Sequence, residues 1–184
     1  MSSVGVFYGR MNPFTRGHKA AVNFIRSTGR TPIIVISHSF NTTTNPLTVN
    51  EKREAIREMV GKNIEILSTS KNKPHIHMIL NNLKKRGIEN IEVFLGSNRI
   101  PQFGYLTKYG VKLTPFGNKR NESNSGLAGV SGRKARTAAV SGNKKAFQSM
   151  MPNTLSVATA NKLMRLIQNR TTPAPSPAKR RRKS

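Results

Sequence analysis

The sequence predicts an α/β protein with a Rossmann-like parallel sheet of about five strands, helices on both faces and a disordered basic C-terminal tail. Three observations support this fold class. Short apolar runs alternate with amphipathic runs along the chain, and the run at 31–39 is almost continuously apolar, as in a strand that is covered on both faces. Glycines or basic residues end several of the amphipathic runs, as they commonly end helices.

The expected strands are short and rich in β-branched residues. They lie at 4–9, 31–39, 63–69, 91–97 and 111–116. The expected helices show apolar residues at helical spacing; in the second of them Ala55, Ile56, Met59 and Val60 form one stripe. These helices lie at 18–29, 50–61, 75–87, 99–110, 131–142, 144–152 and 153–170, and we expect Asn153 to cap the last one.

The length of 184 residues corresponds to one domain with appendages. We expect a main domain at 1–152, a C-terminal amphipathic helix at 153–170 and a proline-rich basic tail at 171–184. Lys179, Arg180, Arg181, Arg182 and Lys183 form the basic end of that tail. This run is read as a nucleic-acid contact or a nuclear import signal, and the alternative is a solvated charge run with no specific partner.

Positive charge is the strongest compositional feature. Thirty-two Lys and Arg stand against seven acidic residues, all of them glutamate, and the net charge is +25. Such a protein attracts polyanions, so we expect DNA, RNA or nucleotide phosphates as partners. The absence of aspartate argues against a carboxylate metal cage or a catalytic carboxylate pair.

The sequence also bears on compartment. It has no cysteine, which excludes disulfides and cysteine-bound zinc. No apolar run approaches the roughly 20 residues that cross a bilayer, and no basic flank precedes an apolar run at the N-terminus. We therefore expect no membrane contact and an intracellular protein, cytoplasmic or nuclear, with the inside of a virus particle as a further alternative.

The segment GRMNPFTRGHKAA (9–21) joins the first expected strand to the first expected helix. In a parallel sheet, ligands bind beyond the carboxyl ends of the strands, and a helix N-terminus offers free N–H groups to a phosphate. Gly9 and Gly17 would allow close approach of a ligand, and Thr15 and His18 can direct a hydroxyl and an imidazole toward it. The segment is neither a P-loop nor the dinucleotide fingerprint, and it predicts a phosphate site of another design.

This segment resembles the HxGH signature of the nucleotidyltransferase superfamily, in the GRxNPxTxGH variant of archaeal-type and phage members, with Thr15 in place of the first histidine. Three later segments are similar to further motifs of that superfamily, in the same order. SHSFNTTTNPL (37–47) resembles its SH(S/T)-x-NPL loop, LGSNRIPQFGYLTKYG (95–110) its GSDR segment, and VSGRKARTAA (130–139) its ISxTxxR motif. The resemblance covers roughly residues 4–152 and identifies 1–152 as a nucleotidyltransferase-like domain.

The resemblance implies transfer of a nucleotidyl group, most simply adenylyl, from ATP or another nucleoside triphosphate to a small phosphorylated acceptor. It implies His18, Arg136 and Thr15 as catalytic residues, with His18 at the α-phosphate and Arg136 at the β- and γ-phosphates. It further implies nucleotide binding by Gly9, Arg10, Met11, Asn12, Thr15, Gly17, His18, Ser131, Gly132, Arg133 and Arg136. The acceptor-side candidates are His38, Asn98 and Arg99, and Mg²⁺ would be carried by the triphosphate, with no metal site in the protein.

Two positions depart from the family's motifs. Asn98 replaces the aspartate of GSDR, and Arg133 replaces the threonine of ISxTxxR. These changes mark either a specialised acceptor or a weakened active site. The second alternative is a nucleotidyltransferase-fold protein that serves as a basic nucleic-acid-binding or virion structural protein.

Several other residues have simpler interpretations. His75 and His77 flank an isoleucine with no visible third ligand, so a surface or packing role is favoured over metal binding. The apolar residues of the C-terminal third are expected in the core or in helix packing: Phe147, Met150, Met151, Leu163 and Met164.

Overall fold

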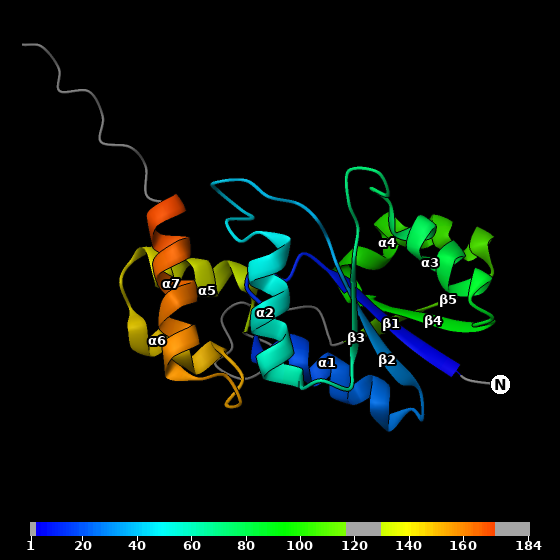
Figure 1. Ribbon diagram of the computed structural model, residues 1–184, viewed down its shortest axis with the longest axis horizontal. Coiled ribbons are helices and arrows are strands. Elements are labelled where there is room, and N and C mark those ends of the chain that lie inside the picture. Colours follow the sequence, from blue (N-terminus) through cyan, green and yellow to red (C-terminus); the bar gives the residue numbers. More distant parts are fainter. Residues whose placement is uncertain (1–2, 117–129, 172–184) are drawn as a thin grey trace, which may run out of the picture.

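The computed structural model describes residues 3–116 and 130–171 (Figure 1). Residues 172–184 of the predicted basic tail lie outside these ranges. The strands are β1 (Ser3–Gly9), β2 (Thr31–Ile36), β3 (Glu65–Ser68), β4 (Asn90–Gly96) and β5 (Lys112–Phe116). The α-helices are α1 (Arg16–Ser27), α2 (Val49–Val60), α3 (Ile76–Lys85), α4 (Ile100–Phe103), α5 (Gly132–Val140), α6 (Lys144–Met150) and α7 (Val157–Thr171), and two 3₁₀ helices, η1 (Ser97–Arg99) and η2 (Gly104–Tyr109), flank α4.

The five strands form one parallel sheet in the order β3-β2-β1-β4-β5. Strand β1 lies at the centre, with Val6 opposite Ile33 of β2 and Val93 of β4. The chain leaves β1 for β2 on one side and later returns to β4 on the other, so the carboxyl end of β1 lies at the point where the strand order reverses. Open α/β sheets bind ligands at this point. The predicted fold class is confirmed.

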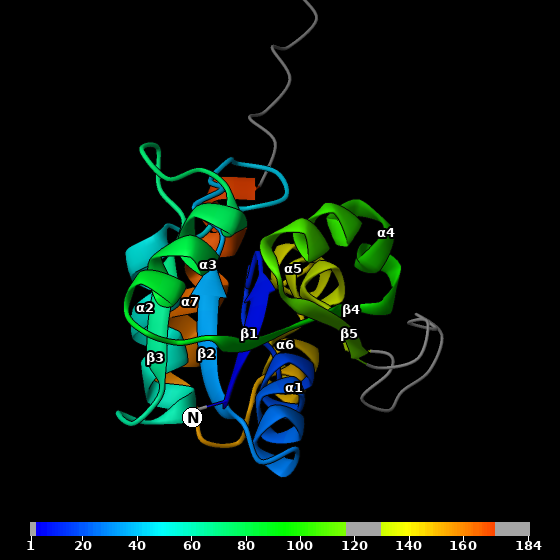
Figure 2. The same cartoon turned by 90° about the vertical axis from the view of Figure 1, so that its right-hand side faces the viewer.

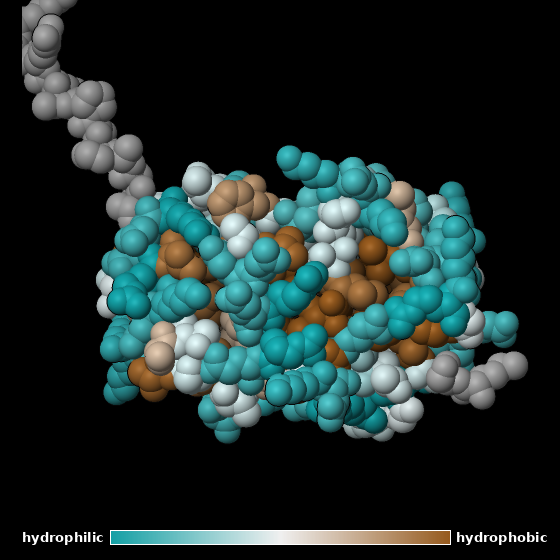
Figure 3. All heavy atoms as spheres, viewed as in Figure 1, coloured by the Kyte–Doolittle hydropathy of each residue, from teal (hydrophilic) through white to brown (hydrophobic). Residues whose placement is uncertain are grey.

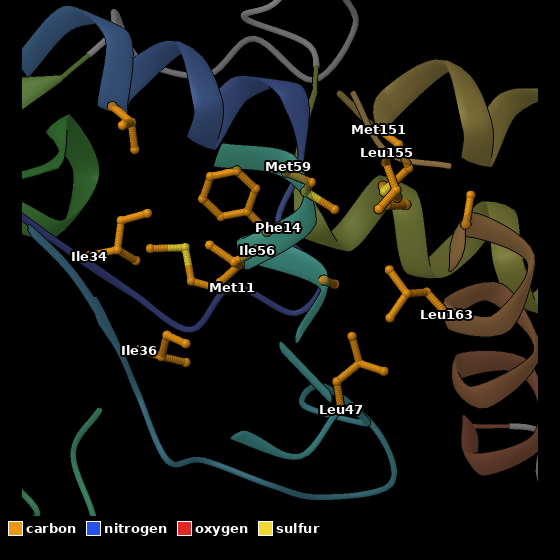
Figure 4. Close-up of a cluster of buried hydrophobic side chains, with 14 of the residues drawn as sticks. Met11, Phe14, Ile34, Ile36, Leu47, Ile56, Met59, Met151, Leu155 and Leu163 are labelled. Carbon is orange, nitrogen blue, oxygen red and sulfur yellow. The ribbon is translucent and has the colours of Figure 1, made fainter. Parts of the chain in front are cut away.

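Helices cover both faces of the sheet (Figure 2). One apolar cluster packs α1, α2 and the C-terminal helices α5, α6 and α7 against one face, and a second packs α3 and η2 against the other. Figure 4 shows Met11 and Phe14 of the loop after β1 inside the first cluster, together with Ile56 and Met59 of α2. This burial of large side chains provides the main stabilisation of the layers.

The C-terminal apolar residues lie where the sequence predicted. Phe147, Met151, Leu163 and Met164 are buried, and Met150 packs against the same cluster. Helix α7 therefore completes the core of the main domain.

The last helix begins later than predicted. It starts at Val157, and Ser156 takes the place expected for Asn153, because its hydroxyl accepts the Thr159 N–H at 3.2 Å. The preceding turn is held to α2, since Thr154 donates a 2.8 Å hydrogen bond to the carbonyl of Met59. Residues 152–155 therefore belong to a turn that is bonded to α2. The helix ends at Thr171, one residue into the range expected for the tail.

The surface in Figure 3 is mostly polar, and apolar side chains show between α2 and α3 along the edge strand β3. Within residues 3–116 and 130–171, no helix is long and apolar enough to cross a membrane.

Candidate active site

The loop after β1 folds back against the core. Met11 has a left-handed backbone (φ 54°) with its side chain buried, and the Asn12–Pro13 peptide is cis. The side-chain oxygen of Asn12 accepts the Leu47 N–H at 2.9 Å, which joins this loop to the segment before α2. The side chains of Met11 and Phe14 thus anchor the loop in the core and leave its backbone at the carboxyl edge of β1.

His18 lies in the first turn of α1, and its ring is oriented by Thr15. The backbone N–H of Thr15 donates to Nδ1 of His18 at 2.9 Å, and the Thr15 hydroxyl lies 2.9 Å from the same nitrogen. Because a backbone N–H can only donate, Nδ1 must accept, and the neutral ring carries its proton on Nε2. The ring also stacks on Phe14 at 5.3 Å between centroids. His18 is therefore held in one orientation and one tautomer.

Helix α5 meets the same loop from the far end of the chain. Ser131 caps the helix, since its hydroxyl accepts the Lys134 N–H at 3.2 Å. Gly132 packs so closely on the loop that a Cβ there would lie 3.2 Å from the carbonyl oxygen of Asn12. A guanidinium nitrogen of Arg136 donates to that same carbonyl at 2.7 Å. The N-terminus of α5, with its partial positive charge, is thereby fixed beside the N-terminal end of α1.

These two helix ends border a cleft of about 820 Å³. Its described lining contains four arginines and no acidic residue; the arginines are Arg10, Arg99, Arg133 and Arg136. Burial lowers the pKa of Arg136, and the positive charges of Arg10 and Arg133 lower it further. Mutual repulsion among these guanidinium groups is relieved when an anion binds between them, so the cleft is suited to a polyphosphate.

Most of the predicted site residues line this one cleft. They are Gly9, Arg10, Met11, Asn12 and His18 from the first segment, Asn98 and Arg99 from the third, and Ser131, Gly132, Arg133 and Arg136 from the fourth. Arg133, the departure from the motif, forms part of the wall without closing the cleft. Asn98 lies close to Gly96, with its side-chain oxygen 3.1 Å from the position of an added Cβ.

Three predicted residues lie elsewhere. Thr15 is 1% exposed and stands behind His18, so the structure gives it an orienting contact with His18 in place of the predicted contact with phosphate. Gly17 belongs to the first turn of α1 and is absent from the lining. His38 also lies outside the lining, and its ring is 2.8 Å from the Thr69 hydroxyl at the end of β3. Residues 179–183 lie outside the described ranges.

Arg99, one of the acceptor-side candidates, lies against two aromatic rings at the cleft. Its guanidinium carbon lies 5.7 Å from the ring centre of Tyr8 and 5.0 Å from that of Phe103. Tyr8, Ser97 and Gln102 join the lining although none was among the predicted site residues. Tyr8 immediately precedes Gly9 at the end of β1, and this position is the signal that could have identified it.

Lys52 was missed as well. It is 1% exposed, and its ammonium donates to the carbonyls of Arg10 at 2.9 Å and Ser37 at 2.6 Å. Burial lowers the pKa of Lys52 to about 8. The ammonium thus joins the segments that follow β1 and β2, beneath the cleft. In the sequence, Lys52 lies on the apolar stripe of α2, one turn before Ala55 and Ile56, and this position indicates that its side chain is buried.

His75 and His77 stack on each other at 5.4 Å, and His77 stacks on Tyr109 at 4.9 Å. In the described part of the chain, no three His, Asp or Glu side chains are grouped so that they could hold a metal ion. The packing role expected for these histidines agrees with their ring contacts.

The central strand, the loop after it and the arginine-lined cleft define an α/β protein with a positively charged cleft at the carboxyl end of its central strand. The sequence matches the cytidylyltransferase-like family over residues 6–112, more than half of its length, and the chain belongs to that family. This confirms the predicted relationship to nucleotidyltransferases at the level of the superfamily. No curated protein matches the sequence.

Solved structures share the fold at low sequence identity. A nicotinic acid mononucleotide adenylyltransferase from Plasmodium falciparum, complexed with NaAD, superimposes with a TM-score of 0.61 and 15% identity, over 90% of this chain and 98% of that one. A bifunctional NMN adenylyltransferase/ADP ribose pyrophosphatase from Francisella tularensis gives a TM-score of 0.56 and 15% identity, over 93% of this chain and 53% of that one. The present chain therefore spans about half the length of the Francisella protein.

Proposed function

We propose that this protein transfers a nucleotidyl group, with ATP as the expected donor, to a small phosphorylated acceptor and releases pyrophosphate. The observation that carries the proposal is the junction of α1 and α5 at one cleft. There, His18 from the first turn of α1 and Arg136 from α5 flank a volume lined by four arginines. The family membership and the nucleotide complexes of the related folds support the same reaction class.

In this proposal an oxygen of the acceptor phosphate attacks the α-phosphorus of the nucleotide. The bond from the α-phosphorus to the oxygen bridging it to the β-phosphate breaks, and its electron pair leaves with pyrophosphate. The attacking phosphate is already ionised at neutral pH, so no general base is needed. Such transfers depend on positioning and electrostatic stabilisation.

Each residue then has a separate task. Nε2–H of His18 donates to a non-bridging oxygen of the α-phosphate as negative charge develops there. Arg136 and the free N–H groups at the start of α5 receive the charge of the leaving pyrophosphate. Arg99 and Asn98 line the same cleft and would bind the acceptor phosphate.

The metal enters with the nucleotide. Because no carboxylate lines the described cleft, its side chains offer no hard anionic ligand for Mg²⁺. We propose that Mg²⁺ is bound by the triphosphate oxygens and water, as part of the substrate.

The direct experiment measures pyrophosphate release by the full chain with Mg²⁺ and ATP or CTP. The acceptor panel contains nicotinamide mononucleotide, nicotinic acid mononucleotide, phosphopantetheine and a phosphorylated alcohol. We expect acceptor-dependent release that falls by roughly 100-fold or more in His18→Ala. Arg165→Ala, an exposed arginine of α7, is the matched control and should retain full activity. Equal release by wild type and His18→Ala would exclude this mechanism.

The charge of the chain favours a second candidate, a protein that keeps the fold and binds nucleic acid. The net charge of +25 is the observation behind it. It predicts nucleic-acid binding that weakens steeply with salt, together with no pyrophosphate release from any nucleotide and acceptor pair. Acceptor-dependent turnover would exclude it as the sole function.

A further inference from the structure

A continuous series of aromatic rings leads away from the cleft across the face covered by α3 and η2. Tyr8, at the cleft, packs edge-on against Phe103 at 5.6 Å, and Phe103 lies 6.3 Å from Tyr105. Tyr105 packs edge-on against His77 at 6.5 Å. His77 then stacks between Tyr109 and His75. We call this series the aromatic row; its members are Tyr8, Phe103, Tyr105, His77, Tyr109 and His75.

Two rings of the row, those of Tyr105 and His75, are exposed to solvent. Tyr105 is 39% exposed and His75 is exposed, whereas Phe103 and Tyr109 are partly buried against the core beneath them. Burial raises the pKa of Tyr105, and its neighbours Tyr8 and Tyr109 raise it further, which is consistent with three phenols gathered at one place. Core packing accounts for the inner rings but not for the exposed ones.

The segments that carry the row are basic and contain no acidic residue. Between Ser70 and Ile88 the cations are Lys71, Lys73, Lys84, Lys85 and Arg86, and between Ser97 and Gly110 they are Arg99 and Lys108. Neither segment contains a single glutamate or aspartate. Figures 1 and 2 show α3 and α4 on the same side of the sheet. Arg99 lies against the rings of Tyr8 and Phe103, and the ammonium of Lys84 donates to the carbonyl of Tyr109. Arg86 is paired with Glu65.

Exposed aromatic rings within a basic surface are the arrangement that binds single-stranded nucleic acid. Bases stack on the rings whatever their sequence, because every base has a π-face, while lysines and arginines contact the phosphates. A duplex keeps its bases stacked inside and cannot use the rings. A folded acidic protein partner would use the cations but has no need of a run of rings.

We propose that the aromatic row is a binding surface for single-stranded nucleic acid, and that it leads the strand toward the arginine-lined cleft. This surface is additional to nucleotidyl transfer, since Tyr105, His75, His77 and Tyr109 are absent from the lining of the cleft. The two functions can therefore be tested separately.

The test uses fluorescence anisotropy with the full chain and a labelled oligothymidylate of about 12 nucleotides. An abasic strand of the same length and label is the second probe, and a duplex of the same length is the third. We expect the base-bearing single strand to bind roughly 10-fold or more tightly than the abasic strand, because only the former can stack. Both single strands carry the same phosphates, so any contribution of the basic residues at 179–183 is the same for both.

Substitutions inside and outside the aromatic row test whether the single strand binds there. Tyr105→Ala is expected to weaken binding of the oligothymidylate by roughly 5- to 10-fold and to leave abasic binding unchanged. Tyr105→Phe keeps the ring and should bind as wild type. Phe40→Ala removes a ring that is 53% exposed and lies outside the row, so it is the matched control and should have no effect.

Equal affinity for the base-bearing and abasic strands would overturn the proposal, and so would an equal response to Tyr105→Ala and Phe40→Ala. Tighter binding of the duplex than of the single strand would overturn it as well. Pyrophosphate release, measured on the same proteins, should be unchanged in Tyr105→Ala. If the protein shows no nucleotidyl transfer, the binding measurement still tests the aromatic row. If the protein binds no single strand, the pyrophosphate assay still tests nucleotidyl transfer.

Discussion

A guanidinium nitrogen of Arg136 donates a 2.7 Å hydrogen bond to the carbonyl oxygen of Asn12, 124 residues earlier in the chain. This bond fastens α5 to the loop after the central strand and brings two helix N-termini to one cleft. Arg136 therefore has two tasks: it holds the loop, and its charge faces the proposed triphosphate site.

Replacing Arg136 should affect nucleotide binding more than folding. We expect Arg136→Ala to lower kcat/KM for the nucleotide by roughly 100- to 1000-fold, because a preorganised donor to the phosphates is lost. Arg136→Lys keeps the positive charge but not the several N–H donors of the planar guanidinium, so its kcat/KM should lie between those of Arg136→Ala and the wild type. Steady-state pyrophosphate release and nucleotide titration calorimetry would measure both effects. Wild-type kinetics in Arg136→Ala would refute the assignment.

The contact between Thr15 and His18 predicts the tautomer of the histidine ring. Since the Thr15 N–H donates to Nδ1, the neutral ring should carry its proton on Nε2. The ¹⁵N chemical shifts of a histidine-labelled sample, recorded at a pH where the ring is neutral, would show this directly. Thr15→Val keeps the backbone donor and should keep the tautomer, at a cost of about 1 kcal/mol for the lost contact of the hydroxyl with Nδ1. A proton found on Nδ1 would contradict the described geometry.

Gly132 sets the distance between α5 and the loop. In Gly132→Ala the new Cβ would lie 3.2 Å from the Asn12 carbonyl oxygen and 3.3 Å from an Arg136 nitrogen, so the helix end must shift. We expect nucleotide affinity to fall roughly 10-fold, because the two helix ends separate. Gly104→Ala is the control, since an added Cβ there meets nothing within 4 Å. Similar affinities for the two variants would show that the close contact is unimportant for binding.

Lys52 predicts a pH dependence of stability. Its pKa is about 8 in the folded protein and about 10.4 in an unfolded chain, so between these values the unfolded chain binds more protons. The contribution of Lys52 to the free energy of unfolding therefore rises with pH across this window and is lowest below pH 8.

Lys52→Met should remove this rise and leave the carbonyls of Arg10 and Ser37 without their donor, at a cost of roughly 1–3 kcal/mol at pH 7. Urea unfolding of both proteins at pH values on either side of 8 would measure the difference. If the difference between the two proteins is the same at every pH, Lys52 does not titrate as described.

Local sequence patterns determined the elements of this protein. All five strands were predicted from their β-branched runs, and the segment at 9–21 that lines the cleft was found from its position between the first strand and helix. These features depend on residues that are neighbours in the chain, so the sequence carries them directly. The start of the last helix was the exception: it lies at Val157 and not at Asn153, and Thr154 in the preceding turn is bonded to Met59 of α2, a contact that local sequence does not show.

Only the tertiary structure decided the roles within the site. Spacing placed Thr15 and His18 together but could not show that Thr15 is buried behind the ring, nor that His38 is bonded to Thr69 instead of lining the cleft. The burial of Lys52 and the bond from Arg136 to Asn12 join segments 42 and 124 residues apart. Such contacts arise from the order of the strands and the packing of helices over them, and no local pattern specifies them.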